Sequence, residues 1–434
     1  MDARNRRIGI LAGGGVLPRE IADSAARRGQ KVSIVAIDGE ADADFGARAV
    51  TRVNWGQIGA MIRALKREGV TDLVIVGHVR RPELKILRPD LGFFRHLPQI
   101  VKIVASGGDD GVLRRVVRFF EGQGIAVIGP DAAAPELVVR AGALGRVAAS
   151  PSDQADIAQG LALIRALGPY DIGQSVVVAA GRIEAIEGVE GTDRMLARAA
   201  SLRTEAGAAS VRGGVLVKRS KPGQDLRVDM PAIGPTTVAG AHAAGLNGLA
   251  VEADKVIVAE RTATLERADG LGLFVEGIRD PEGGTPPRRF DARKAGMGFV
   301  RLGRRAPATH AARDAAKAVA TLDALIPFRC GRAAVVVRNH VLAVESSEGV
   351  DATLMRAAGL RQWKSITHRR RGVVALRDAA DLSAEVVSAV AAGGYAGLVL
   401  ARGRGSGEAW GARIADAEAQ GLFVVARMAE AGAP

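Results

Sequence analysis

The chain has 434 residues, a length typical of two to four domains, and 48% of them are hydrophobic, so it can bury sizeable cores. With 25% charged residues, the composition is that of a folded globular protein and excludes general disorder. The one cysteine, Cys330, excludes an intramolecular disulfide framework and Cys-rich zinc modules. It also fits a reducing compartment, and we expect a cytoplasmic protein.

Lys and Arg outnumber Asp and Glu by 13, so the chain attracts anionic partners such as nucleic acid, phospholipid surfaces or phosphorylated metabolites. We expect no nucleic acid partner, because Trp55, Trp363 and Trp410 lie far apart and basic and aromatic residues are not interleaved. The apolar run at residues 8–12 is too short for a secretion signal. No run of about 18 apolar residues occurs, so any membrane contact should be peripheral.

The first 133 residues alternate strand-like and helix-like segments. The predicted strands are 7–12, 32–37, 72–79 and 125–129, and the predicted helices are 18–28, 56–68 and a third that begins at Asp109. Strands that alternate with helices in this way indicate a parallel sheet. We therefore predict an α/β fold with a Rossmann-like N-terminal domain over residues 1–133.

A second α/β unit is predicted over residues 150–280. Its predicted helices are 151–167 and 192–203, and its predicted strands are 175–180, 214–218, 249–251, 255–259 and 271–275. Thr192 is a candidate side-chain cap for the second of these helices.

Residues 281–313 are rich in Pro, Gly and Arg and predict a basic linker. Beyond it, residues 314–434 repeat the second unit at a constant offset of 158. Glu187, Glu190, Gly191 and Asp193 fall on Glu345, Glu348, Gly349 and Asp351. We predict a degenerate C-terminal copy of the second domain with the same α/β topology.

Candidate ligand contacts in the first domain follow two of its predicted strands: Gly13, Gly14 and Gly15 after the first, and Gly77, His78 and Val79 after another. Backbone N–H groups where a glycine-rich turn opens a helix favour phosphate. The full dinucleotide-binding pattern is absent, so a tight turn is an equally good interpretation. The second set lies at the sheet edge where doubly wound folds bind ligands.

The second unit carries an acidic loop and a dense polar segment. The loop Glu187–Asp193 offers oxygen ligands to Mg²⁺ or hydrogen bonds to sugar hydroxyls, although helix capping also explains it. In the segment 218–229, KRSKPGQDLRVD, four cations can bind phosphate and two acids can hold a divalent metal or orient water. If the segment is extended, Asp225, Arg227 and Asp229 share one face. The copy lacks these residues at 377–383, as expected if the first copy acts and the second supports it.

At these residues the sequence resembles the bacterial UDP-2,3-diacylglucosamine pyrophosphatases of the LpxI type. The resemblance rests on GILAGGGVLP, DLVIVGHVRRPEL, SVVVAAGRIEAIEGVEGTD and KRSKPGQDLRVDMPAIGPTT, in collinear order over about residues 6–280. The KPGQDxRxDxPxIG stretch is the most specific part. Family members end near the position of Ile278, so the linker and the repeat are additional.

The resemblance implies a lipid-linked nucleotide held between the first two domains, and Mg²⁺-dependent attack of water on the α-phosphorus of UDP-2,3-diacylglucosamine. The implied products are UMP and 2,3-diacylglucosamine 1-phosphate (lipid X), in lipid A synthesis. Asp225 and Asp229 would be catalytic and metal-binding. The implied substrate contacts are Gly13, Gly14, Gly15, Gly77, His78, Val79, Thr192, Asp193, Lys218, Lys221, Gln224 and Arg227.

Alternatives stay open at this point. The chain could be a non-catalytic binder of nucleotide sugars or lipid X, or an oxidoreductase that uses the glycine-rich turn. Expected partners are the amphiphilic substrate and a further copy of the chain in a homo-oligomer. We also expect peripheral contact with the inner-membrane surface. The basic linker, with Phe290 and Phe299, is a candidate membrane contact, and a merely solvated linker explains it equally well.

Overall fold

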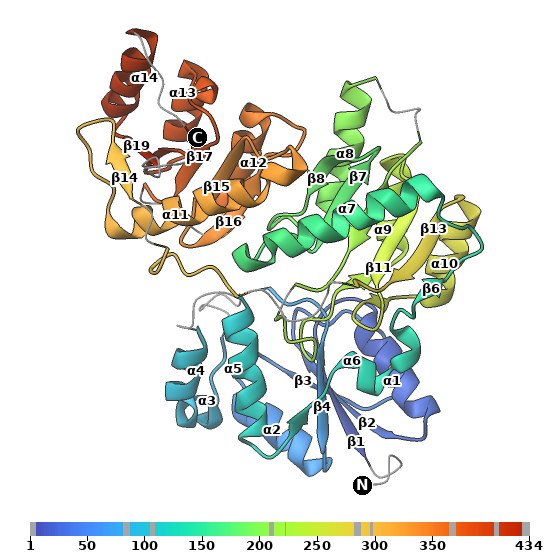
Figure 1. Ribbon diagram of the computed structural model, residues 1–434. Helices are drawn as coiled ribbons and strands as arrows, with labels where there is room; N and C mark the ends of the chain where they lie inside the picture. The colour runs from blue at the N-terminus through green and yellow to red at the C-terminus, as the bar shows by residue number, and fades with distance from the viewer. Residues whose placement is uncertain are drawn as a thin grey trace.

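Three large sheets, formed one after another along the chain, organise the molecule into three lobes (Figure 1). The computed structural model describes residues 6–80, 87–104, 109–207, 212–221, 223–281, 288–295, 298–363, 370–402 and 408–427. In Figure 1 the N-terminal domain lies at the bottom, and the second and third domains lie above it. Among the described residues, no helix is long and apolar enough to cross a membrane.

The N-terminal sheet is parallel throughout, with the strand order β3-β2-β1-β4-β5. Its strands are β1 (Arg7–Ala12), β2 (Lys31–Ile37), β3 (Val50–Val53), β4 (Asp72–Val76) and β5 (Ala126–Val127). The helices are α1 (Leu17–Arg27), α2 (Ile58–Arg67), α3 (Leu91–Arg95), α4 (Leu97–Val104), α5 (Asp109–Glu121) and α6 (Pro130–Ala133). The Rossmann-like prediction is confirmed. Strand β3 and helices α3 and α4 were not predicted, because their apolar runs are short.

The second sheet has the order β6-β13-β11-β9-β7-β8, with a parallel centre and antiparallel edges. Its strands are β6 (Gly142–Ala143), β7 (Ser175–Ala179), β8 (Arg182–Ile186), β9 (Val215–Lys218), β11 (Gly248–Glu252) and β13 (Phe274–Ile278); β10 (Ala232–Ile233) and β12 (Ile257–Val258) form a separate pair. The helices are α7 (Pro151–Leu167), α8 (Thr192–Glu205), α9 (Pro235–Ala243) and α10 (Arg261–Gly270).

The third sheet repeats this plan in the order β14-β19-β18-β17-β15-β16, so the predicted degenerate copy is confirmed. Its strands are β14 (Phe299–Arg301), β15 (Ala333–Val337), β16 (His340–Val344), β17 (Val373–Leu376), β18 (Gly397–Leu400) and β19 (Phe423–Arg427). Its helices are α11 (Thr309–Ala324), α12 (Val350–Trp363), α13 (Ala384–Ala392) and α14 (Glu408–Ala419). Even the irregularity in the first hairpin recurs at the same offset, at Val177/Val178 and at Val335/Val336.

Part of the segment expected as a linker, 281–313, belongs to the third sheet. Strand β14 pairs antiparallel with β19, as β6 pairs with β13 in the second sheet, and α11 already begins at Thr309. The Pro, Gly and Arg content that predicted a linker hides this strand, because three residues are too few to show a strand period.

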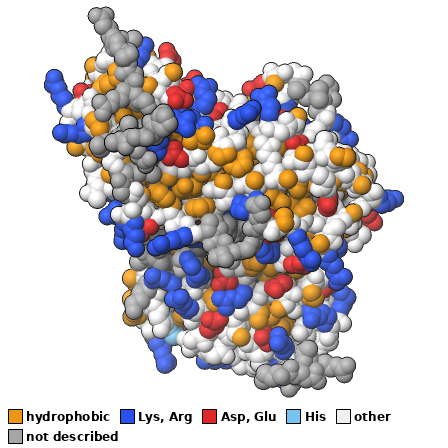
Figure 2. All heavy atoms as spheres, in the orientation of Figure 1, with side chains coloured by type: hydrophobic (Ala, Val, Ile, Leu, Met, Phe, Trp, Pro, Cys, Tyr) orange, Lys and Arg blue, Asp and Glu red, His pale blue; other side chains and the backbone are white. Residues whose placement is uncertain are grey.

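The two copies share one hydrophobic core. Helices α7 and α11 contact each other and contribute Leu161 and Ile164 from one copy and Ala315 and Val319 from the other to the same buried cluster. Figure 2 shows hydrophobic side chains gathered on the visible face between the two upper lobes. The second and third domains therefore pack as one body.

A chain that ends at residue 283 should associate or aggregate, because it exposes the apolar face of α7 that the third domain covers. Light scattering after gel filtration and a thermal melt would measure this against the full chain. A shortened chain that stays monomeric, with an unchanged melting temperature, would contradict the shared core.

Candidate active site in the second domain

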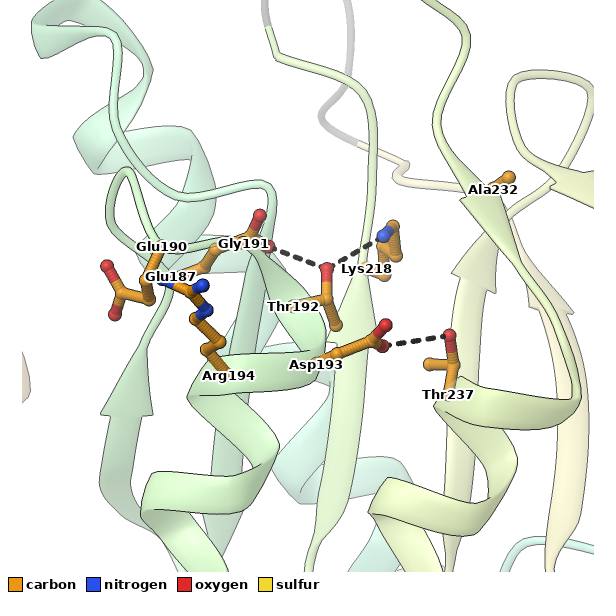
Figure 3. A pocket seen from close by; sticks show the side chains of 9 residues that line it. All are labelled: Glu187, Glu190, Gly191, Thr192, Asp193, Arg194, Lys218, Ala232 and Thr237. Carbon is orange, nitrogen blue, oxygen red and sulfur yellow. Dashed lines mark hydrogen bonds between the residues drawn. The ribbon is translucent and has the colours of Figure 1, made fainter. Parts of the chain in front are cut away.

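A pocket of about 460 Å³ opens at the ends of strands β8 and β9, between the first turns of helices α8 and α9 (Figure 3). Its lining residues are Glu187, Glu190, Gly191, Thr192, Asp193, Arg194, Lys218, Ala232 and Thr237. Ala232 also packs against the core of the N-terminal domain, so the pocket borders that domain. The predicted residues Thr192, Asp193 and Lys218 thus lie together.

A buried chain of hydrogen bonds forms one wall of the pocket. The Nζ of Lys218 donates to the Oγ1 of Thr192 at 2.8 Å, and this hydroxyl donates to the Oε2 of Glu187 at 3.0 Å. Ser175 adds its hydroxyl to that of Thr192 at 3.1 Å. All four side chains are buried. The network fixes a cation and a hydroxyl group at the pocket wall.

Thr192 does not cap helix α8 as predicted. Gly191 occupies the cap position with φ +85°, and no side chain caps the helix there. Thr192 is the first helical residue, and its hydroxyl faces Lys218 and Glu187 (Figure 3). Glycine adopts this positive φ easily, whereas a β-branched residue would not. Because Gly191 is the cap residue, the Thr192 side chain can point into the pocket.

Burial lowers the pKa of Lys218, and the carboxylates of Glu187 and Asp193 oppose this effect. Helices α8 and α9 both begin at the pocket, where their unpaired N–H groups and positive dipole ends favour an anion. Asp193 and Thr237 lie 3.5 Å apart across these two first turns. The pocket therefore combines one buried cation with two helix N-termini.

The C-terminal copy lacks the three donors of this network. At the offset of 158, Ser175 corresponds to Ala333, Thr192 to Val350 and Lys218 to Leu376, whereas Glu187 is kept as Glu345. The carboxylate of Glu345 instead accepts the backbone N–H of Arg332 at 2.8 Å. The copy keeps the scaffold and loses the polar wall. Comparing the two copies in the sequence would have identified Ser175, which we did not predict.

The segment around Asp225 is a turn and not an extended strand, so the condition under which Asp225, Arg227 and Asp229 would share one face is not met. The N–H groups of Val228 and Asp229 both donate to the Asp225 carbonyl at 3.1 Å. The Arg227 guanidinium binds both Asp225 carboxylate oxygens, at 2.9 and 2.7 Å, and holds the pKa of that carboxyl below its usual range. Arg227 also pairs with Glu121 of α5 at 2.9 Å, and so joins the second domain to the first.

The other predicted residues of this segment form a separate set that does not line the pocket. Lys221 pairs with Asp171 at 3.2 Å. Gln224 accepts an N–H of Gln174 at 2.9 Å and donates to Asp229. Within the described ranges, no three His, Cys, Asp or Glu side chains are grouped so that they could hold a metal. Metal binding by Asp225 and Asp229, and the requirement for Mg²⁺, stay predictions.

The glycine-rich turn of the first domain does not present free amides for phosphate. The N–H groups of Gly13 and Gly14 donate to the carbonyls of Val76 and His78, and that of Gly15 donates to Asp42 Oδ1 at 2.7 Å. A Cβ on Gly14 would lie 2.4 Å from the His78 ring, so glycine is needed there for close packing of two loops. Gly77, His78 and Val79 lie at this same edge, on the surface. The tight-turn interpretation fits these bonds better than a dinucleotide site.

A buried cluster of four charges connects the pocket loop to the C-terminal copy. The Glu190 side chain points away from the pocket centre (Figure 3) and meets Arg198 at 3.2 Å and Arg356 at 3.3 Å. Arg198 and Arg356 also both pair with Glu348. Glu348 and Arg356 are the repeats of Glu190 and Arg198, so the cluster has approximate two-fold symmetry within one chain. The C-terminal copy thereby helps to hold the loop that lines the pocket.

Comparison with known proteins agrees with this geometry. A model of the LpxI N-terminal domain matches residues 7–137, and a model of the LpxI C-terminal domain matches twice, at residues 140–276 and 300–425. The chain belongs to the LpxI family. It is similar to the UDP-2,3-diacylglucosamine pyrophosphatase LpxI of Caulobacter vibrioides, with 39% identity over 278 residues, which is 64% of this chain and 99% of the relative. The remaining 434 − 278 = 156 residues are close in number to the offset of 158 between the two copies.

As the pH rises, Lys218 should lose its proton before the pH reaches the usual lysine pKa of 10.5, because burial lowers the pKa of this group. Activity that needs the Lys218 cation should therefore decline already below that pH. In Lys218→Arg the guanidinium stays charged, so the alkaline decline of kcat/KM should move to higher pH even if the rate itself falls. Profiles of kcat/KM against pH measure this. The same alkaline limb in both proteins would argue against the role of Lys218.

Arg356→Met should lower kcat/KM by about tenfold, because the pocket loop loses one of the two cations that hold Glu190. If Arg356 acts through Glu190, adding Glu190→Gln should cause little further loss. Arg427→Met, which removes an ion pair with Asp323 inside the same copy, is the control. Additive losses in the double variant, or an equal loss in the control, would count against this coupling.

Proposed function

We propose that this chain hydrolyses the pyrophosphate bond of UDP-2,3-diacylglucosamine and releases UMP and 2,3-diacylglucosamine 1-phosphate, as a step of lipid A synthesis. The observation that carries the proposal is the buried Lys218–Thr192–Glu187 network between the N-termini of α8 and α9. The LpxI relative, whose name states this activity, is covered over 99% of its length.

The chemistry required is water attack on one phosphorus atom and departure of the bridging oxygen with the other phosphate. Negative charge grows on the phosphate oxygens in the transition state, and fixed positive groups stabilise it. Lys218 and the two helix N-termini would supply this stabilisation, and the Thr192 hydroxyl would orient an oxygen. The sugar would lie toward Asp193 and Thr237.

Asp225 would act at the boundary between the first two domains. Its carboxylate is ionised and held by Arg227, which also binds Glu121 of the N-terminal domain. A substrate that lies between the domains would compete for these groups, since its pyrophosphate attracts Arg227 and releases Asp225. Mg²⁺ is commonly held by one or two carboxylates together with substrate phosphates, so a requirement for it has to be tested with the substrate present.

Purified protein should release UMP and lipid X from UDP-2,3-diacylglucosamine with Mg²⁺, and EDTA should stop the release. Asp225→Ala should abolish release and keep a folded protein, because Asp225 lies in a turn and not in a core cluster. Asp416→Ala is the matched control, since it removes an acid that pairs with Arg413 on α14 of the third domain. Full activity of Asp225→Ala would remove Asp225 from the mechanism. Binding without release under any metal would favour the non-catalytic binder.

A further inference from the structure

Exposed large hydrophobic side chains are concentrated on helices α3 and α4 of the N-terminal domain. Leu91 is 89% exposed, Phe94 58%, Leu97 39% and Val101 55%. Leu91 and Phe94 are three residues apart on α3, and Leu97 and Val101 are four apart on α4, so the two side chains of each pair share a helix face. We refer to these four side chains as the apolar stripe. The transfer of apolar side chains out of water lowers the free energy, so a stripe of them on a surface indicates a partner.

The inward side of these helices is already packed. Phe93 and Ile100 are only partly exposed, and the ring of His96 meets that of Phe119 of α5 edge to face at 5.2 Å. The outward stripe is therefore not a part of the core that has been left open. Within the described residues, it is the more exposed side of a helix pair whose other side is partly buried.

Cations surround the apolar stripe. Arg88 and Arg95 are exposed beside it, and α5 contributes the exposed Arg115 and Arg118. The two α5 arginines line a groove of about 450 Å³ together with Gln99, Ile103, Phe119, Gly122 and Gln123. Apolar side chains with Arg at their border, on a chain of net charge +13, complement an anionic lipid bilayer: the apolar groups enter the acyl boundary and the cations meet the headgroups.

We infer that the outward face of α3 and α4 is the surface through which this protein binds an anionic bilayer. The occupant is a lipid surface and not a nucleic acid, because the stripe is aliphatic apart from one ring and offers no row of stacking side chains. It replaces the 281–313 segment, which partly belongs to the third sheet, as the candidate membrane contact.

This face lies close to the proposed site. Helix α5 packs against α4 on one side, and at its end Glu121 pairs with Arg227 of the Asp225 turn. The charge of Arg114, also on α5, contributes to the low pKa of Asp225. Helix α5 thus contacts both the helix that carries part of the stripe and the Asp225 turn. If the proposed function holds, a diacyl substrate would pass from the bilayer to the site over a short path.

The test is flotation of the full-length protein with vesicles of phosphatidylglycerol and phosphatidylcholine that contain no substrate. The wild type should bind vesicles rich in phosphatidylglycerol, bind pure phosphatidylcholine weakly, and be released by salt. Leu91→Ser with Phe94→Ser should reduce the bound fraction by about tenfold or more, since two anchors are lost. Met355→Ser is the control, because Met355 is also apolar and 70% exposed but lies on α12 of the third domain.

Absence of wild-type binding, or equal binding by the double variant, would overturn the inference. Self-association of the wild type that the double variant abolishes would also overturn it, since a second copy of the chain would then cover the stripe. Turnover of substrate dispersed in detergent should be the same for wild type and double variant. A failure of the proposed function would instead abolish that turnover in both proteins and leave vesicle binding intact.

Discussion

The burial of the Lys218 cation is the interaction on which the site depends. A charge removed from water is costly unless it is paired and hydrogen-bonded. The Thr192 hydroxyl oxygen accepts a hydrogen bond from the Lys218 ammonium, and Glu187 and Asp193 supply the negative charge that offsets part of the cost. These partners come from the loop between β8 and α8 and from the first turn of α8, so the loop must hold one conformation. Gly191 provides the turn, and the ion pairs of Glu190 with Arg198 and Arg356 hold the loop in place.

The C-terminal copy shows what remains when this constraint is lifted. It keeps the scaffold contacts: Asp314 accepts the N–H groups of the β15–β16 turn, as Asp156 does for the β7–β8 turn. It has Leu376 where the first copy has Lys218, however, and its Glu345 accepts the backbone N–H of Arg332 in the same copy. What the copy gives to the first is its apolar face and Arg356. The second copy therefore occupies the position that a two-fold related partner would occupy.

Periodicity and turn residues predicted most of the fold, because strands and helices of this α/β type are long enough to show their patterns. The repeat was visible because Glu187 and Glu190 recur at one offset. The site was only partly predictable. Lys218 and Thr192 stood out as polar residues beside buried strands, but the partner of Arg227 is Glu121, more than a hundred residues earlier. Likewise, only the three-dimensional structure shows that the carboxylate of Asp42 accepts the Gly15 N–H.

The central claim is that one chain holds one site, built by the first copy around Lys218. Calorimetric titration of Asp225→Ala with detergent-dispersed substrate tests it most directly, because this variant should bind without turnover. The account predicts one bound substrate per chain, and a large loss of affinity when Lys218→Met is added. Two equivalents per chain, or unchanged affinity without Lys218, would contradict it.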